Sequence, residues 1–484
     1  MEFYKNQIVT VLIEDMGNEG EGIGKIDGYT LFIKDAVIGD TVQAKITKVK
    51  KNYGFARLMN IEEPSPHRVQ PPCPFARQCG GCQLQALSYS QQLKYKEKKV
   101  RKNLERIGGM GKIPMEPVIG MEEPFHYRNK AQFPMGIDRE GHIITGFYAS
   151  RTHTIISNRE CLLGVHQNKK ILDMLIDHME KYHIAPYDEI SGKGLVRHVL
   201  LRYGFRTGEI MVCLILNGPY LPGAEKLADR FFSLAGMTSF MVNVNTKRDN
   251  VILGDKTKLV WGKTYITDYI QDLKFCISPA SFFQVNPRQT EKMYEKALEY
   301  AALTGEEIVW DLYCGIGTIS LFLAKAAKKV YGVEVIPQAI EDARENARLN
   351  HLNNVEFFVG RAEEIFPAKV KKERVQGDVI VVDPPRKGCG RELLDAVLQV
   401  MPPKIVYVSC DSSTLARDVK YLREGGYEVV RVCPFDNFAM TAHVETVCLL
   451  SNRKLKPDTY IKLSLDMEDY YRIKDAEKEK NKTS

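Results

Sequence analysis

One cysteine of the C-terminal third stands between an apolar run and a set of helix-capping residues. The run Ile405-Val406-Tyr407-Val408 leads to Cys410, and Asp411-Ser412-Ser413 follow. The β-branched run predicts a buried strand that delivers Cys410 to a loop before a helix. Because a thiol near a helix N-terminus has a lowered pKa, Cys410 is the candidate nucleophile.

Two acidic residues are placed at similar points. Asp383 ends the apolar run of residues 379–382, and Glu445 stands just before the run of residues 446–450. The ligand crevice of an open α/β sheet lies beyond the carboxyl ends of its strands. We therefore expect Cys410, Asp383 and Glu445 to converge on one pocket.

These residues must be positioned by strands and helices, and the sequence pattern predicts a doubly wound α/β domain over residues 271–452. Apolar runs alternate with helical patterns, except that none separates residues 427–433 from 444–450, where we expect an antiparallel hairpin. The glycine-rich turn at 311–317 lacks a complete G-x-G-x-x-G, and Glu334 ends the next run, where an acid could bind ribose hydroxyls. This pattern favours an adenosine cofactor without pyrophosphate, such as S-adenosylmethionine.

A cysteine-rich segment lies ahead of this domain. Cys73, Cys79 and Cys82 form a C-x5-C-x2-C pattern, and Cys161 is the nearest candidate for a fourth ligand. Thiolates at such short range repel one another unless a cation holds them. Four cysteines permit zinc or an iron–sulfur cluster. Because the paired C-x-x-C knuckles usual for structural zinc are missing, we favour a [4Fe–4S] cluster.

Residues 1–60 predict a small OB-like β-barrel with strands at 7–14, 29–33, 41–49 and 53–61 and glycine-rich turns. The last two strands and their turn interleave basic and aromatic side chains: Lys45, Lys48, Lys50, Lys51, Tyr53, Phe55 and Arg57. Such a surface suits single-stranded nucleic acid, with cations on phosphates and rings under bases. The formal net charge of +7 agrees with a polyanionic partner.

Residues 61–270 predict a central α+β domain that begins with a proline-rich linker. A helix over residues 91–107 has one apolar side, and the rest of its surface is basic, which usually indicates a solvated face: Lys94, Lys96, Lys98, Lys99, Arg101, Lys102 and Arg106. The charged tail, residues 453–484, is expected to be disordered.

Length and composition indicate the number of domains and the cellular compartment. The 484 residues predict about three domains. We find neither a signal peptide nor an apolar run long enough to span a membrane, and we expect a cytoplasmic protein. Eleven cysteines in such a chain favour thiol or metal chemistry over a disulfide framework.

Together these motifs resemble those of the RNA (uracil-C5)-methyltransferase family, most of all the bacterial 23S rRNA enzymes of the RlmD (RumA) type. The resemblance covers roughly residues 1–452. Besides the cysteine segment, it rests on S-P-x-S-F-F-Q-V-N at 278–286, D-L-Y-C-G-x-G at 311–317, D-P-P-R at 383–386, S-C-D at 409–411 and H-V-E at 443–445.

The resemblance implies a multidomain enzyme with an N-terminal TRAM barrel, a central domain bearing a [4Fe–4S] cluster and a Rossmann-like methyltransferase domain. Cys410 would be the nucleophile and Glu445 the base. The cluster ligands would be Cys73, Cys79, Cys82 and Cys161, and the S-adenosylmethionine site would be lined by Gln284, Tyr313, Glu334 and Asp383. The resemblance leaves the contact of Gly360-Arg361-Ala362 with the adenine open.

The implied substrate is a single-stranded or flipped uridine, because a duplex hides carbon 6 of the base. Phe282 and Phe283 are expected to offer a stacking surface. The expected target is 23S rRNA, since relatives with a barrel and a cluster mostly modify it. We expect no membrane or protein partner, and a monomer.

Four other functions were weighed. A cytosine-C5 RNA methyltransferase would carry Pro-Cys after the acidic strand end, where this chain has Pro384-Pro385-Arg386, and an exocyclic-amine methylase would carry an aromatic residue in place of Arg386. The target could instead be a tRNA uridine. The chain could also be a non-catalytic RNA-binding iron–sulfur protein, although the joint presence of Cys410, Glu445 and Asp383 argues against this.

Overall fold

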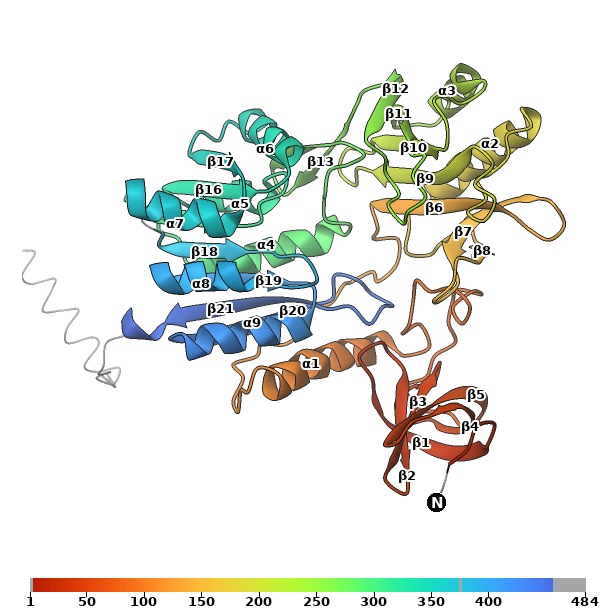
Figure 1. Cartoon of the computed structure of the whole chain (residues 1–484), viewed down its shortest axis with the longest axis horizontal. Helices are drawn as coiled ribbons and strands as arrows, with labels where there is room; N and C mark the ends of the chain where they lie inside the picture. The colour runs from red at the N-terminus through yellow and green to blue at the C-terminus, as the bar shows by residue number, and fades with distance from the viewer. Residues whose placement is uncertain (1–2, 374–376, 456–484) are drawn as a thin grey trace, which may run out of the picture.

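The computed structural model describes residues 3–373 and 377–455, and it begins with a closed five-stranded barrel (Figure 1). The strands are paired in the order β1-β2-β3-β5-β4: β1 Ile8–Met16, β2 Gly22–Ile26, β3 Tyr29–Lys34, β4 Thr41–Val49 and β5 Tyr53–Glu63. The expected four strands are thus one too few, because β2 occupies part of the glycine-rich stretch. A Cβ at Gly24 would lie 2.4 Å from the side chain of Val11, so glycine permits close strand packing there.

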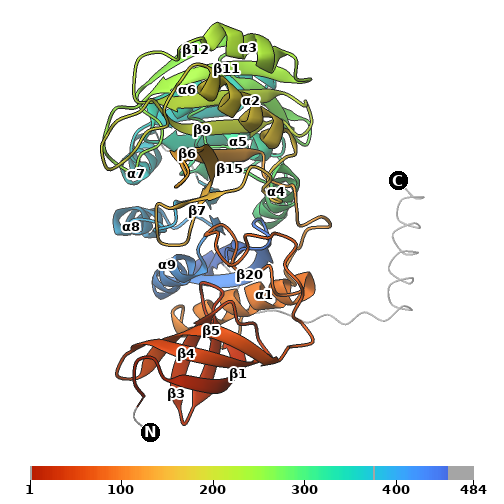
Figure 2. The ribbon, with the colours of Figure 1, turned by 90° about the vertical axis from the view of Figure 1, so that its right-hand side faces the viewer.

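Helix α1, Tyr89–Arg106, lies between the barrel and the C-terminal domain in both views (Figures 1 and 2). Lys98 and Lys102 contact Asp15 of the barrel, and Tyr95 donates to the carbonyl of Gly17 at 2.8 Å. The basic residues of α1 are therefore not a uniformly solvated face. Lys96 in particular is completely buried.

The central domain is built on a seven-stranded sheet of order β12-β11-β10-β9-β6-β7-β8. Helices α2 (Gln167–Lys181) and α3 (Ala224–Phe232) pack on one face around a core that includes Leu172, Leu227 and Phe240. The strands are β6 Lys130–Ile137, β7 Ile143–Tyr148, β8 Ile155–Ser157, β9 Val196–Tyr203, β10 Ile210–Leu216, β11 Met237–Val244 and β12 Lys256–Gly262. This agrees with the α+β architecture expected for this region.

The C-terminal domain is a doubly wound sheet of order β17-β16-β15-β18-β19-β21-β20. The strands are β15 Ile308–Asp311, β16 Lys329–Glu334, β17 Val355–Val359, β18 Val379–Val382, β19 Lys404–Ser409, β20 Tyr427–Phe435 and β21 Glu445–Asn452. Strand β21 pairs antiparallel with both β19 and β20, which confirms the predicted hairpin. The order reverses between β15 and β18, and ligands bind at such switch points.

Two helix layers cover this sheet. One core joins α4 (Pro287–Ala301), α5 (Thr318–Ala324) and α6 (Pro337–Leu349) to the sheet and also takes in the neighbouring hairpin β13 (Ile266–Ile270) and β14 (Leu273–Ile277). The other core joins α7 (Ala362–Glu373), α8 (Arg391–Val400), α9 (Ser412–Glu424) and α1. Helix α1 therefore packs as part of the C-terminal domain's helix layer as well as against the barrel.

The described chain ends with a short 3-10 helix, Arg453–Leu455. The expected disordered tail lies outside the described residues from position 456 onward. Within residues 3–373 and 377–455, no helix has the length and apolar character needed to cross a membrane.

Candidate active site

A cavity of about 1380 Å³ opens at the carboxyl ends of the C-terminal sheet's parallel strands. All six residues predicted for catalysis and cofactor binding line it: Gln284, Tyr313, Glu334, Asp383, Cys410 and Glu445. They come from the segment before α4, the turn after β15, the end of β16, the loops after β18 and β19, and the first residue of β21. The topology thus gathers residues that are up to 161 positions apart in the chain (284 to 445).

The β15–α5 turn leaves the backbone open toward the cavity. Gly315 has a φ of 54° and Gly317 a φ of 83°, which are left-handed conformations that favour glycine. A Cβ added at Gly315 would meet no atom within 4 Å. A ligand can therefore approach this turn closely, as adenosine cofactors do in doubly wound sheets.

Glu334 is held rigidly at the next strand end. Its Oε1 accepts hydrogen bonds from the backbone N–H groups of Val335 at 2.8 Å and Ile336 at 3.1 Å. Those bonds leave the second carboxylate oxygen for a ligand's hydroxyl groups. The segment Gly360-Arg361-Ala362, whose contact with the adenine the sequence left open, also borders this cavity.

Cys410 follows β19 directly, before helix α9. The side chain of Asp411 caps this helix by accepting from the N–H groups of Ser413 at 2.8 Å and Thr414 at 3.2 Å. Burial, together with the nearby carboxylates of Glu445 and Asp383, raises the pKa of Cys410 to about 12. The expectation of a lowered pKa was therefore wrong, because Asp411 already occupies the helix N-terminus and the carboxylates disfavour a thiolate.

Two buried carboxyl groups border the same part of the cavity. Burial raises the pKa of Glu445 to about 8, with a further contribution from the charge of Asp383, while Arg386 acts in the opposite direction. Burial raises the pKa of Asp383 to about 7. Groups with such pKa values can accept or release a proton near neutral pH.

The loop that carries Asp383 is fastened to the helix that follows Cys410. Asp418 of α9 accepts from the backbone N–H of Cys389 at 2.8 Å and from the Tyr407 hydroxyl at 2.7 Å. Arg417 Nη2 donates to the carbonyl of Lys387 at 2.9 Å. These bonds fix the relative positions of two loops that both border the cavity.

Sequence reasoning missed three residues that also line the cavity: Arg386, Phe438 and His443. Burial and the surrounding cations, Arg386 first among them, lower the pKa of His443 to about 4, so its imidazole is neutral. Arg386 and His443 stand in the quoted D-P-P-R and H-V-E motifs, and that position was the available signal. Nothing local marked Phe438.

Of the two phenylalanines expected to offer a stacking surface, only one is exposed. Phe282 is 69% exposed and lines the cavity, whereas Phe283 is 2% exposed and packs on Phe275 in the core. Adjacent residues in an extended segment point in opposite directions, so one ring of such a pair faces the core.

The four predicted cluster ligands form one neighbourhood. Burial and, to a smaller extent, the nearby thiols of Cys161, Cys79 and Cys73 raise the pKa of Cys82 to about 12. No three of these sulfurs lie within 4.8 Å of one another. Four thiols without a nitrogen or oxygen ligand among them suit zinc or an iron–sulfur cluster.

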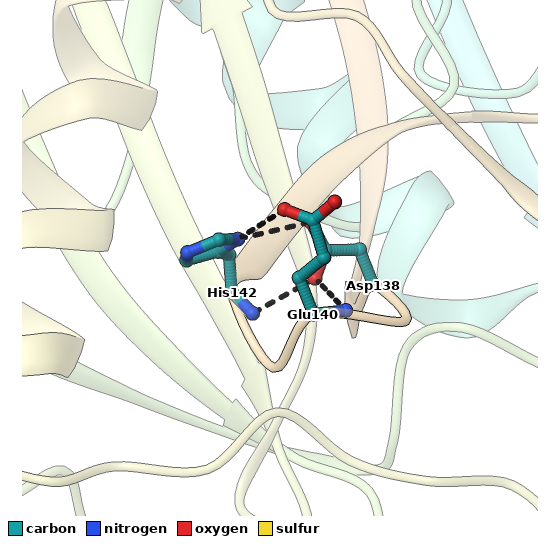
Figure 3. Close-up of side chains that lie close together, drawn as sticks. All are labelled: Asp138, Glu140 and His142. Atoms are coloured by element: carbon teal, nitrogen blue, oxygen red, sulfur yellow. Dashed lines mark hydrogen bonds and ion pairs between the residues drawn. The ribbon is translucent and has the colours of Figure 1, made fainter.

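Among the described residues, the one group of three possible ligand atoms within 4.8 Å lies elsewhere, in the β6–β7 turn (Figure 3). It consists of Asp138, Glu140 and His142. Asp138 Oδ1 accepts from the backbone N–H groups of Glu140 and His142, both at 2.9 Å. This group of three side chains therefore has a structural explanation, because its hydrogen bonds cap a hairpin turn.

A doubly wound sheet with an open glycine turn and an acid at the next strand end fits an adenosine cofactor such as S-adenosylmethionine. Residues 240–453 match the family described as tRNA (Uracil-5-)-methyltransferase, and residues 2–59 match the TRAM domain.

Relatives cover almost the entire chain. An uncharacterized RNA methyltransferase of Halalkalibacterium halodurans is 52% identical over 447 residues, which span 92% of this chain and 97% of that protein. One of Clostridium tetani is 48% identical over 448 residues, with the same coverage. The structure of Pyrococcus abyssi tRNA (uracil-54, C5)-methyltransferase in complex with S-adenosyl-L-homocysteine matches with a TM-score of 0.73 and 28% identity, over 91% of this chain and 100% of that one. The chain belongs to the RNA (uracil-5)-methyltransferase family.

Proposed function

We propose that this enzyme methylates carbon 5 of a uridine in 23S rRNA, with Cys410 as the nucleophile and Glu445 as the base. The observation that carries the proposal is the cavity in which the Cys410 thiol lies among the buried carboxyl groups of Glu445 and Asp383. The combination of a TRAM barrel with a four-cysteine set favours rRNA, following the resemblance described above. A tRNA uridine is the second candidate, because the Pyrococcus abyssi relative acts on tRNA and its match extends over most of this chain.

The chemistry requires a nucleophile because carbon 5 of uracil reacts poorly by itself. The sulfur of Cys410 forms a bond to carbon 6, and the electron pair of the carbon 5–carbon 6 double bond moves to the ring as an enolate. The thiol proton leaves to the carboxylate of Asp383, so Glu445 stays unprotonated for the later step. S-adenosylmethionine, when bound, supplies the electrophilic methyl group that carbon 5 takes up. Glu445 then removes the proton from carbon 5, the double bond re-forms, and the sulfur–carbon 6 bond breaks.

The remaining cavity residues have positioning roles in this proposal. Glu334 would bind the ribose hydroxyls of S-adenosylmethionine, and Gln284 and Tyr313 would border its amino-acid and adenosine parts. Gln284 Nε2 lies 3.5 Å from Asp383 Oδ2, so the two side chains share one part of the cavity. We expect Asp383 to contact both the cofactor and the edge of the uracil. Phe282, exposed at the cavity, offers a ring for stacking with a flipped base.

Release of tritium from RNA labelled at carbon 5 of uridine tests the proposed reaction, because methylation at carbon 5 must displace that hydrogen. We expect S-adenosylmethionine-dependent release from 23S rRNA and none from tRNA transcripts. Release from tRNA alone would favour the second candidate. Methyl incorporation without tritium release would exclude carbon 5 as the site.

Protein purified without oxygen is expected to be brown and to contain about four irons and four labile sulfides, because the four cysteines form an all-thiol donor set. Cys79→Ser should lower the iron content and bleach the visible absorption. Cys276→Ser, at a half-buried cysteine of β14, is the matched control and should retain full iron. A colourless protein with stoichiometric zinc and no sulfide would contradict the cluster.

The barrel carries a compact aromatic surface that we propose binds the RNA strand. Phe32, Tyr53 and Phe55 lie with ring centroids 5.6 to 5.8 Å apart on paired strands β3 and β5. Arg57, Lys45 and Lys48 extend from the same region, since Arg57 pairs with Lys45 and Phe55 with Lys48 across β4 and β5. Bases can stack on such rings while the cations contact phosphates.

Tyr53→Ala is expected to weaken RNA binding by about 1–3 kcal/mol, the usual contribution of one base stacked on an aromatic ring. Affinity for S-adenosylhomocysteine should not change, because the barrel lies away from the cavity. Tyr220→Ala is the control, since Tyr220 is also an exposed tyrosine but stands before α3 in the central domain. Equal RNA affinities for both variants in a filter-binding titration would show that the barrel rings do not stack on RNA.

A further inference from the structure

The loop between β20 and β21, residues 436–444, brings several groups to the cavity. It contains Phe438 and His443, which line the cavity, and it leads directly into Glu445. Glu445 pairs with Phe435 across the hairpin, so Asp436 stands at the root of the loop, one residue beyond that pair. A shift at Asp436 would therefore be transmitted to Glu445 through the strand pairing.

The polar groups of this loop are bound mainly by a segment more than 300 positions away. The N–H groups of Gln83 and Leu84 both donate to the carbonyl of Met440 at 3.0 Å, and the N–H of Met440 donates to Gln92 Oε1 at 3.1 Å. Lys99 Nζ donates to the carbonyl of Ala442 at 2.8 Å. The loop conformation thus depends on helix α1 and on the residues that precede it.

Lys96 makes the most deeply buried of these contacts. Its ammonium group contacts Asp436 Oδ1 in an ion pair whose side chains are both 0% exposed, and it donates to the carbonyl of Phe438 at 3.0 Å. Tyr89, also on α1, donates to the other carboxylate oxygen of Asp436 at 2.8 Å. One ammonium therefore connects the root of the loop with the backbone of Phe438.

The stability of the folded protein does not by itself explain why the Lys96–Asp436 ion pair is buried. Removing two charges from water is costly, and replacement of a buried pair by apolar residues is often neutral or stabilising. A buried pair does, however, impose one geometry on the groups it joins, because other positions leave a charge uncompensated. The two contacts of Lys96 give such a constraint to the loop that enters Glu445.

We propose that Lys96 is a positioning residue that, through Asp436 and the Phe438 carbonyl, holds the β20–β21 loop so that Glu445 reaches the carbon 5 proton and Phe438 borders the uracil. This inference rests on the proposed role of Glu445 as the base. Cys410 follows a different strand, β19, and its attack does not depend on the loop in the same way. Loss of Lys96 should therefore impair elimination more than formation of the adduct.

The test compares formation and decay of the covalent protein–RNA complex in variants of the full-length protein. Lys96→Met alone leaves Asp436 charged and buried, so it is expected to be strongly destabilised. The double variant Lys96→Met/Asp436→Asn keeps the site neutral and retains an acceptor for Tyr89. Lys94→Met, at an exposed lysine on the same helix, is the matched control.

We expect the double variant to bind S-adenosylhomocysteine normally and to form the adduct at a rate within about threefold of wild type, while elimination slows by roughly ten- to a hundredfold, as a displaced catalytic group would cause. The adduct with methylated RNA should then accumulate on a denaturing gel, as is also expected for Glu445→Gln, in which the base itself is lost. A purely structural defect would instead reduce formation and decay together.

Two outcomes separate the inference from the proposed function. If Glu445→Gln traps the adduct but the double variant turns over like Lys94→Met, or loses formation and elimination equally, the positioning role is wrong and the base assignment stands. If Glu445→Gln turns over normally, Glu445 is not the base, and the positioning inference fails with it.

Discussion

Cys410→Ala is expected to abolish both methyl transfer and the covalent protein–RNA complex. The sulfur is the atom that adds to carbon 6, and alanine offers no replacement. Loss of a nucleophile typically lowers kcat by several orders of magnitude. Binding of S-adenosylhomocysteine and RNA should be nearly unchanged, because Cys410 is only partly buried and its removal leaves the Asp411 helix cap in place.

RNA that contains 5-fluorouridine makes this prediction visible. Fluorine cannot leave carbon 5 as a cation, so the wild-type enzyme should become trapped as a stable adduct. Cys410→Ala should give no adduct, whereas Cys276→Ala should be trapped like wild type. An adduct with Cys410→Ala would place the nucleophile at another residue.

Glu445→Gln is expected to separate addition from elimination. Glutamine keeps the size and hydrogen-bonding capacity of the side chain but cannot accept the carbon 5 proton. Methyl transfer should therefore proceed and elimination should slow by roughly 10²- to 10⁴-fold, the usual contribution of a general base. A complex between Cys410 and methylated RNA should accumulate on a denaturing gel, and normal turnover would refute the assignment.

The pH dependence of elimination provides a second measurement on the same residue. Burial and the charge of Asp383 disfavour the Glu445 carboxylate and raise its pKa to about 8, so the basic form is gained as pH rises through that value. Decay of the preformed wild-type adduct should thus accelerate about tenfold per pH unit below pH 8 and level off above it. This break should be lost in Glu445→Gln.

The positions of the cavity residues could be predicted from the sequence because the topology is simple. Asp383 and Cys410 each follow an apolar run, and parallel strands place their carboxyl ends at one edge of a sheet. Both ends were therefore expected at one edge, and in the structure β18 and β19 pair directly. Glu445 was placed correctly because the last two runs have no helix between them and must pair as a hairpin.

The electrostatics of the site could not be predicted in this way. A helix N-terminus next to Cys410 suggested a lowered pKa, whereas burial and the carboxylates of Glu445 and Asp383, which are distant in sequence, raise it. The burial of Lys96 could not be predicted for the same reason. Its neighbours in the chain indicated a solvated face, but its partner Asp436 lies 340 positions away. Local composition does not contain such partners.

In the barrel, the sequence prediction failed for a different reason. Strand β2 was missed because Gly22 and Gly24 resemble turn residues, although they serve here to let adjacent strands pack closely. Likewise, Phe282 and Phe283 are equivalent in the sequence, and only the fold shows which ring faces the core.

The most direct test of the central claim is mass-spectrometric mapping of 5-methyluridine in rRNA and tRNA from cells that lack this protein, complemented with the wild-type or the Cys410→Ala form. We predict that 5-methyluridine disappears from 23S rRNA in the deletion strain, returns with the wild-type protein and stays absent with Cys410→Ala, while tRNA is unchanged. Unaltered 5-methyluridine in both RNA classes would contradict the proposed activity, and a loss confined to tRNA would contradict the proposed target.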